Sequence, residues 1–353
     1  MRRLALLVCP APATLGALTL LCLLRGGAGQ AQPTLPVWQS PLTLPTLPLP
    51  TAAEEAEEAE QPSAEAADEA GSWDSTVTLT ALLDGEEQTV TLEDYLWGVV
   101  AAEMPASFEP EALKAQVIAA RTYTLYKLAH PSGRHDTQLC SDPGCCQAWM
   151  SRADRRAAWG GDADALEQKL DAAVEETDGL AVCWEGAPIQ AVFHAASAGA
   201  TRAADEVWEA SLPYLQSVAS PEGEEVPNYY SAVPISADEF AAAIDTLGLG
   251  CDLTGDLSGW IGETEYDAAG LPTAITIGGV SVPTTALRTL FGLRSACIAL
   301  SAADGVVTAY VTGYGHGVGM SQYGANALAE RGYSAEEILL WYYTGTEVVS
   351  MAQ

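Results

Sequence analysis

Thr91-Leu-Glu-Asp-Tyr-Leu-Trp-Gly-Val-Val-Ala-Ala-Glu-Met-Pro105 predicts a helix that carries one acidic residue on its apolar face. Thr91 has an acidic residue three positions on, which is a capping-box-like helix start. Apolar side chains then recur at the spacing of one helical face, and Glu103 stands where the next apolar residue is expected. Pro105 disfavours helical geometry just before it, so we expect Glu103 near the C-terminal end of the helix.

The position of Glu103 has chemical consequences. A carboxyl group turned toward the packed side of a helix is partly desolvated, which raises its pKa. The negative end of the helix dipole acts in the same direction. A carboxylic acid that stays protonated near neutral pH is suited to general acid catalysis. The alternative is that fraying of the helix end turns Glu103 into water as an ordinary surface residue, and the pattern alone fits both.

A second helix is predicted directly after the first, with Pro110 in its favoured first turn. Leu113 and Val117 belong to its buried stripe. Lys114 and Arg121 lie seven positions apart on another face. These two residues either hydrogen-bond sugar hydroxyls or form a solvated charged face, and the solvated face is the default for such a pair.

The flanking sequence predicts the fold class. Residues 76–90 alternate apolar and polar side chains and indicate a hairpin that turns at Asp84-Gly85. Helix and strand signals then mix without a regular βαβ alternation, which predicts an α+β fold. The helix signals cover residues 91–128, 162–176 and 322–331, and the strand signals cover residues 180–194, 274–283 and 306–312.

The N-terminus has the features of a targeting segment. Arg2 and Arg3 precede an apolar run, residues 4–24, that is long enough to cross a bilayer. Basic residues on the short side favour a single-pass anchor in the cytoplasmic membrane with its N-terminus inside the cell. The alternative is a signal peptide cleaved near Ala28 or Ala31. Either alternative places the rest of the chain outside the cytoplasmic membrane.

Three segments are therefore expected along the chain. Residues 1–31 form the signal or membrane anchor. Residues 32–72 form a Pro-rich and acidic linker without an apolar face to bury, which predicts disorder. Residues 73–353 form one folded domain.

The charge balance limits the partners. The chain has 47 acidic and 15 basic residues, which gives a formal net charge of -32. Such a surface repels phosphate backbones and offers few cations for counterion release, so nucleic acid is excluded as a partner. An acidic surface is compatible with a domain that meets sugar chains.

Four potential metal ligands fall within 12 residues: His135, Cys140, Cys145 and Cys146. A histidine with thiolates at this loop spacing favours zinc. The alternative is a disulfide that joins Cys140 to a distant cysteine, because the expected compartment permits oxidation. The sequence leaves open whether disulfides form among the other cysteines of the domain, which are Cys183, Cys251 and Cys297.

A glycine-rich segment lies near the C-terminus. The glycines from Gly313 to Gly319 fit neither GxGxxG nor a phosphate-binding loop. We expect a tight loop that exposes His316, Ser321 and Gln322, with Ser321 also capping the following helix. These side chains either bind sugar hydroxyls and N-acetyl groups, or the glycines simply allow a packed turn.

Several of these patterns together resemble the stage II sporulation protein D (SpoIID) family, whose motifs occur in order from about residue 76 to residue 347. The matching stretches are residues 95–105, 111–123, 146–149, 194–201 and 315–325. Members of this family are identified as lytic transglycosylases that act on peptidoglycan during engulfment of the forespore in sporulation. The resemblance implies a SpoIID-like catalytic domain behind a single N-terminal membrane segment.

The resemblance also implies a mechanism, because the family's catalytic glutamate falls on Glu103. Glu103 would protonate the glycosidic oxygen between N-acetylmuramic acid and N-acetylglucosamine, and its carboxylate would then take the proton of the muramic C6 hydroxyl. The product would be a 1,6-anhydro ring, and no water would be consumed. The preferred strands would be those whose stem peptides have been removed by an amidase of the stage II sporulation protein P type.

Further site residues follow from the resemblance. Some members bind zinc, structural or near the active site, through a histidine and two cysteines, which by position are His135, Cys140 and Cys146. Cys145 is then left over, and water or Glu103 would fill the fourth place. The expected substrate-binding residues are Lys114, Arg121, Tyr123, His194, Ser197, Thr201, His316, Ser321 and Gln322.

Other functions remain as alternatives. The main one is a non-catalytic wall-binding module that enhances an amidase, since related proteins are described as enhancers. A zinc-dependent hydrolase built on His135 and the cysteines lacks a HExxH-like ligand pair. A serine hydrolase built on His194 and Ser197 lacks a G-x-S-x-G elbow around the serine.

Overall fold

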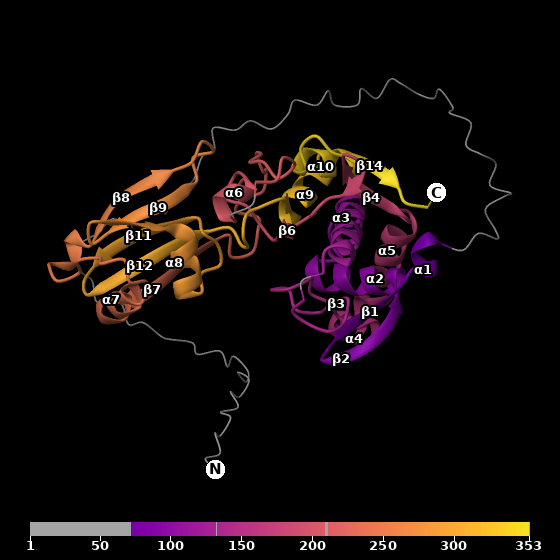
Figure 1. Ribbon diagram of the computed structural model, residues 1–353, viewed down its shortest axis with the longest axis horizontal. Helices are drawn as coiled ribbons and strands as arrows, with labels where there is room; N and C mark the ends of the chain where they lie inside the picture. The colour runs from indigo at the N-terminus through magenta and orange to yellow at the C-terminus, as the bar shows by residue number, and fades with distance from the viewer. Residues whose placement is uncertain (1–71, 132, 209–210, 353) are drawn as a thin grey trace, which may run out of the picture. The chain divides into compact units, whose positions relative to one another are not determined.

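The computed structural model describes residues 72–131, 133–208 and 211–352. The expected membrane segment, residues 1–31, and nearly all of the expected linker lie outside these ranges. Within them, helices and strands mix without regular alternation, which confirms the α+β fold class (Figure 1). No helix in this described part combines the length and apolar character needed to cross a membrane.

The predicted hairpin is present. β1 (Thr78–Leu83) pairs antiparallel with β2 (Glu86–Thr91). Asp84 and Gly85 form the turn with positive φ angles of 52° and 84°, a backbone conformation that suits aspartate and glycine. β3 (Leu139–Cys140) pairs in parallel with β1, and this pairing attaches the cysteine-containing loop to the hairpin.

The two predicted helices follow. α2 (Leu92–Glu103) begins after Thr91, whose side chain accepts a hydrogen bond from the N–H of Asp94 as the sequence indicated. α3 (Pro110–Ala129) begins with its proline. α2 is buried at Leu92 and from Tyr95 through Ala101, because one side packs on the hairpin and the other contributes to the core around α3.

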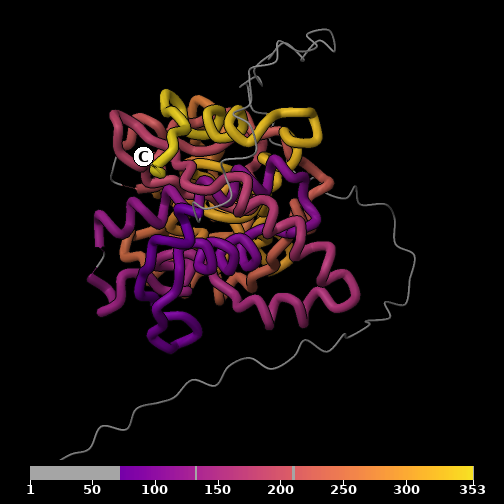
Figure 2. The backbone as a smooth tube through the Cα atoms, turned by 90° about the vertical axis from the view of Figure 1, so that its right-hand side faces the viewer, coloured from indigo at the N-terminus to yellow at the C-terminus, as the bar shows by residue number. Residues whose placement is uncertain are grey.

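α3 lies at the centre of the helical part. Besides α2, the helices that contact it are α5 (Ala163–Glu175), α9 (Gln322–Ala329) and α10 (Ala335–Tyr342), while α4 (Arg152–Trp159) contacts α2 and α5. The N–H of Glu109 donates to Asn326 Oδ1 at 2.8 Å, and the N–H of Ala335 donates to Glu111 Oε2 at 2.8 Å. These bonds attach the two C-terminal helices to the start of α3, although the segments are far apart in sequence (Figures 1 and 2).

Two small sheets join further distant segments. The first contains β4 (Leu180–Trp184), β5 (Ala187–Pro188) and β14 (Glu347–Ser350). The second pairs β6 (Phe193–His194) in parallel with β13 (Met320–Ser321), so that His194 stands opposite Ser321. The histidine motif and the glycine-rich motif therefore lie side by side.

The remaining strands form two three-stranded antiparallel sheets (Figure 1). Their members are β7 (Tyr230–Ser236), β11 (Ile298–Ala303) and β12 (Val306–Thr312) in one, and β8 (Ile261–Tyr266), β9 (Pro272–Ile277) and β10 (Val280–Pro283) in the other. Two helices belong to this part, α7 (Ala237–Asp245) and α8 (Thr284–Phe291). Their rings Phe240 and Phe291 stack with centroids 5.3 Å apart inside a common apolar core.

The structure corrects the prediction for Arg121. Its guanidinium is fully buried and forms an ion pair with Asp74, whose side chain is also fully buried. The Nε of Arg121 donates to Asp74 Oδ1 at 2.9 Å, and Nη1 donates to the carbonyl of Leu180 at 3.0 Å. Arg121 as a sugar-binding residue does not fit this structure, because its donors are used inside the protein.

We expect Asp74→Ala to destabilise the fold by about 3–5 kcal/mol, because it leaves the buried Arg121 guanidinium without its counterion. Lys114→Ala is the matched control: Lys114 pairs with Glu111 at 2.9 Å and Glu176 at 2.6 Å at the surface, where such pairs contribute about 0–1 kcal/mol. Urea unfolding of both variants measures the difference. Equal midpoints would contradict a structural role for the buried pair.

Candidate active site and metal centre

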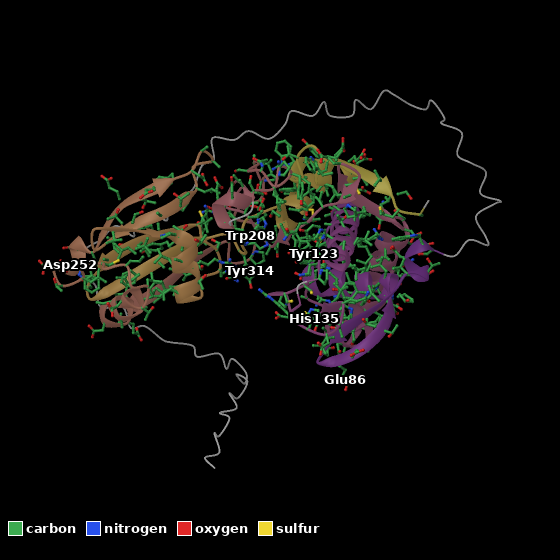
Figure 3. The ribbon with its side chains drawn as sticks, viewed as in Figure 1. Glu86, Tyr123, His135, Trp208, Asp252 and Tyr314 are labelled. Atoms are coloured by element: carbon green, nitrogen blue, oxygen red, sulfur yellow. The ribbon has the colours of Figure 1, made fainter. Side chains whose placement is uncertain are left out.

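A cleft of about 550 Å³ collects residues from all five sequence motifs. The residues that line it are Ala102, Glu103, Tyr123, Pro143, Cys146, Gln147, Gln190, Val192, Phe193, His194, Ala195, Trp208, Arg288, Tyr314, Gly315, His316 and Gln322. Figure 3 labels three of its aromatic residues: Tyr123 on α3, Trp208 after the short helix α6 (Ala204–Val207), and Tyr314 after β12. Residues far apart in sequence thus share one concave surface.

Glu103 is the last residue of α2, and its side chain faces the cleft. Burial raises the pKa of its carboxyl group, while a hydrogen bond of 2.7 Å from the N–H of Ala148 to Oε1 acts in the opposite direction. The net direction is upward, as the helix pattern predicted. The alternative of a surface carboxylate on a frayed helix end does not hold.

The segment that carries Ala148 approaches α2 because of a glycine. A Cβ atom at Gly98 would lie 2.1 Å from the indole Nε1 of Trp149, so only glycine allows this contact. The N–H of Met150 donates to the carbonyl of Gly98 at 3.1 Å. These contacts hold residues 146–150 against the helix and place the Ala148 N–H beside Glu103.

Two histidines lie on the cleft wall, His194 and His316, with ring centroids 5.5 Å apart. Burial lowers the pKa of His194 to about 3 and the pKa of His316 to about 4. His194 Nδ1 lies 3.2 Å from the carbonyl of Val318, to which it donates, and Nε2 accepts from Ser197 Oγ at 2.7 Å. Both rings are therefore neutral at physiological pH and act as hydrogen-bonding groups rather than cations.

A buried carboxylate that the sequence did not reveal anchors this wall. Glu222 accepts hydrogen bonds from the N–H of Ser197 at 2.6 Å, from Ser321 Oγ at 2.5 Å and from Ser220 Oγ at 2.6 Å. Ser220 Oγ also lies 2.8 Å from the hydroxyl of Tyr342. Glu222 follows a proline in an acidic stretch that resembles a surface loop, so no sequence signal marked it.

The network around Glu222 corrects the prediction of an exposed loop. Ser197 and Ser321 are buried, and Ser321 Oγ both donates to Glu222 and caps α9 by accepting from the N–H of Gly324 at 3.2 Å. The cap was predicted, whereas the exposure was not correct. Thr201 is fully buried as well, and its hydroxyl accepts from the N–H of Val218 at 2.9 Å. These three hydroxyl groups support the cleft wall from behind and do not line the cleft.

The predicted substrate-binding residues thus divide into two groups. Those that line the cleft are Tyr123, His194, His316 and Gln322. Those that do not line it are Lys114, Arg121, Ser197, Thr201 and Ser321. The cleft adds six amide, charged or aromatic residues that were not predicted: Gln147, Gln190, Phe193, Trp208, Arg288 and Tyr314. Gln147 and Trp208 stand in or beside motifs that were recognised, so their positions gave a usable signal.

The histidine–cysteine cluster forms as predicted and includes one more residue. The ligand atoms of His135, Cys140, Cys145 and Cys146 all lie within 4.8 Å of one another. Cys145 is therefore part of the cluster and is not left over, whereas Glu103 is outside it. No disulfide joins any of the six cysteines of the described chain, so none of the disulfide alternatives is present.

The geometry of the cluster fits zinc. Tetrahedral zinc places neighbouring sulfur and nitrogen ligands about 3.5–3.8 Å apart. Cys146 Sγ lies 3.7 Å from His135 Nε2 and 4.0 Å from Cys145 Sγ. His135 Nδ1 lies 2.7 Å from the carbonyl of Thr137, to which it donates, and this bond leaves Nε2 free to face a metal. The cluster can thus hold a metal ion, and soft thiolates with one imidazole favour zinc.

Comparisons with known proteins agree with the motifs. The family model for the stage II sporulation protein (SpoIID) matches residues 85–184. The chain is 35% identical over 263 residues to stage II sporulation protein D of Bacillus amyloliquefaciens and of Bacillus subtilis strain 168, covering 74% of this chain and 75% of each relative. It is also 30% identical over 312 residues to the amidase enhancer of Bacillus subtilis, covering 72% of this chain and 40% of that protein. The chain therefore belongs to the stage II sporulation protein D family.

Proposed function

We propose that this protein is a peptidoglycan lytic transglycosylase that cleaves the bond between N-acetylmuramic acid and N-acetylglucosamine, with Glu103 as its acid and base. One observation carries the proposal: Glu103 is the only carboxyl group among the residues that line the cleft in the described chain. A glycosidase that uses water or a covalent intermediate ordinarily needs two opposed carboxyl groups. An intramolecular attack by the substrate's own C6 hydroxyl needs only one.

The single carboxyl group would act twice. Burial raises the pKa of Glu103, which favours the protonated form that donates to the glycosidic oxygen as the bond breaks. The carboxylate formed by this step then accepts the proton of the C6 hydroxyl, and the 1,6-anhydro ring closes. The N–H of Ala148, which donates to Glu103 Oε1, stabilises the carboxylate between the two steps.

Other cleft residues would bind the strand. Trp208, Tyr123 and Tyr314 offer flat apolar faces for sugar rings. His194 and His316 are neutral, so they exchange hydrogen bonds with hydroxyl and N-acetyl groups without adding charge near the acid. Gln147 and Gln322 add amide groups of the same kind.

Zinc would be held by His135, Cys140, Cys145 and Cys146, and when bound it supplies a structural crosslink among thiolates and imidazole. Cys146 belongs to both the cluster and the cleft lining. Ala148, two residues later, donates to Glu103. The ligands would thus fix the segment that positions the acid.

The cellular setting completes the proposal. Residues 1–31 would anchor or export the chain, so that the folded part acts outside the cytoplasmic membrane, in engulfment if the organism sporulates. An amidase of the stage II sporulation protein P type would supply strands without stem peptides. The similarity to the amidase enhancer favours a second candidate function, a non-catalytic wall-binding protein that stimulates such an amidase.

Glu103→Gln separates the two candidate functions. We expect this variant to lose about 10²- to 10⁴-fold in the rate of anhydro-product formation, the usual contribution of a general acid. Mass spectrometry of peptide-free glycan strands after digestion measures the products. Glu93→Gln is the control, since Glu93 lies on α2 but lines a different hollow. A Glu103→Gln variant with normal cleavage would refute the transglycosylase.

The pH dependence tests the role of Glu103 as an acid. The donor must be protonated, so kcat/KM is expected to fall as pH rises through the pKa of Glu103, which burial raises from the ordinary value of a glutamate. His194 and His316, with pKa values of about 3 and about 4, are already neutral in that range. Rate measurements across pH locate this alkaline limb. If the limb moves in His316→Asn, it belongs to a histidine and the assignment fails.

Metal binding is expected to involve four ligands. Loss of a residue that only supports a metal ligand usually weakens metal affinity by about 10- to 100-fold. Replacing a ligand itself, which means His135, Cys140, Cys145 or Cys146 singly, should weaken zinc affinity by more than that. Competition with a chromophoric chelator gives the affinity, and cobalt substitution reports thiolate coordination by its absorption. Cys251→Ser, outside the cluster, is the control. An unchanged affinity in Cys145→Ser would restore the three-ligand site.

A further inference from the structure

Arg288 is a cation without a partner in the cleft. It lies on α8, and its guanidinium is the only guanidinium or ammonium group among the residues that line the cleft in the described chain. The carbonyl of Arg288 accepts a hydrogen bond from the N–H of Leu293 at 2.9 Å, but no hydrogen bond or ion pair joins its guanidinium to any described residue. The two buried arginines of the described chain do have partners: Arg121 pairs with Asp74, and Arg202 donates to the carbonyl of Pro272 at 2.8 Å.

The missing partner is unexpected in this chain. The protein carries 47 acidic residues against 15 basic ones, yet none of the described carboxylates approaches Arg288. Burial lowers the pKa of Arg288, which indicates that water compensates its charge only in part. An incompletely solvated and unpaired cation is costly to maintain. A ligand that brings a negative charge into the cleft would remove this cost.

The groups around Arg288 indicate which kind of anionic ligand it can bind. His316 and His194 are neutral, and Glu103 is the only cleft residue that can carry a negative charge as a carboxylate. The guanidinium of Arg294 lies over the ring of Tyr314 at 4.1 Å, so a second positive charge stands beside this wall. Arg288 can therefore offer its planar fork of donors to one carboxylate on a ligand that otherwise binds through neutral contacts.

A peptidoglycan strand carries such a group only in one state. The lactyl ether of N-acetylmuramic acid ends in an amide where a stem peptide is attached, and in a free carboxylate where the peptide has been removed. The net charge of -32 repels an anionic strand in general, so a local cation is needed to bind one. A guanidinium gains a charge-assisted, two-pronged hydrogen bond from the carboxylate and loses this geometry with an amide.

We propose that Arg288 binds the free lactyl carboxylate of N-acetylmuramic acid and thereby selects strands from which the stem peptides have been removed. This inference rests on the proposed function, since it concerns how the same cleft recognises its substrate. It assigns Arg288 a role in specificity and gives it no part in proton transfer.

The test compares two substrates and three proteins. Peptide-free strands are used as such, or with their lactyl carboxyl groups converted to neutral methylamides. The full-length chain is expected to prefer the free carboxylate by about 10- to 100-fold in kcat/KM, the range for a hydrogen bond to a charged group. In Arg288→Gln this ratio should approach one, and in Arg288→Lys it should be intermediate. Arg331→Gln, an exposed residue outside the cleft lining, should keep the full preference.

Binding measurements keep the inference separate from the proposed function. Calorimetric titration of a short muramic acid oligosaccharide and of its methylamide into the Glu103→Gln protein gives the same ratio for binding, because this variant cleaves too slowly to disturb the measurement. An equal loss of both substrates in Arg288→Gln, or no preference in the unmodified protein, would overturn the inference. If the protein prefers the carboxylate in binding but cleaves neither strand, Arg288 keeps its role and the transglycosylase fails.

Discussion

The buried carboxylate of Glu222 is the constraint on which the cleft wall depends. It receives hydrogen bonds from the segment after β6, through Ser197, and from the segment before α9, through Ser321. A buried carboxylate without such donors would carry a large desolvation cost, so each of the two segments contributes to keeping Glu222 in place. Gly324 belongs to the same arrangement, because a Cβ atom there would lie 2.6 Å from Glu222 Oε2. His194 is attached to this junction, because its Nε2 accepts from Ser197 Oγ at 2.7 Å.

The cleft lining carries far fewer charged groups than the rest of the chain. The chain as a whole is strongly acidic, but the cleft lining contains one carboxyl group and one guanidinium, Glu103 and Arg288. Burial keeps the two histidines neutral. Desolvation raises the pKa of Glu103, and no cation among its recorded interactions lowers it again. The same sparse lining leaves Arg288 available to an anionic group.

A short segment of chain connects the metal cluster to Glu103. Cys146 belongs to the cluster, Ala148 donates to Glu103, and Trp149 packs on Gly98 of α2. Residues 146–149 thus link the ligand set to the helix that ends in the acid. A loop attached at only one of these points would let the Ala148 N–H move away from Glu103, because surface loops are otherwise held by few contacts.

Local patterns were sufficient for the elements whose cause lies within a few residues. The cap at Thr91, the turn at Asp84-Gly85 and the proline start of α3 all appear where the sequence placed them. The same is true of Glu103 at the end of α2, since helical period and a following proline fix it. α10 was missed although Ser334 and Glu337 form a capping box, so its signal was present in the sequence. α4 has no buried residue, so its sequence shows no periodic apolar pattern that would have predicted it.

The sequence by itself therefore determined the family motifs, the mixed fold class, the cysteine cluster and the acidic residue at a helix end, because each is written in neighbouring positions. The tertiary structure alone decided which side chains meet. Arg121 turned inward to Asp74, Ser197 and Ser321 turned inward to Glu222, and Arg288 entered the cleft from a distant helix. These outcomes depend on partners many residues away in the chain. Burial caused by such partners produces no periodic pattern of apolar residues in the local sequence.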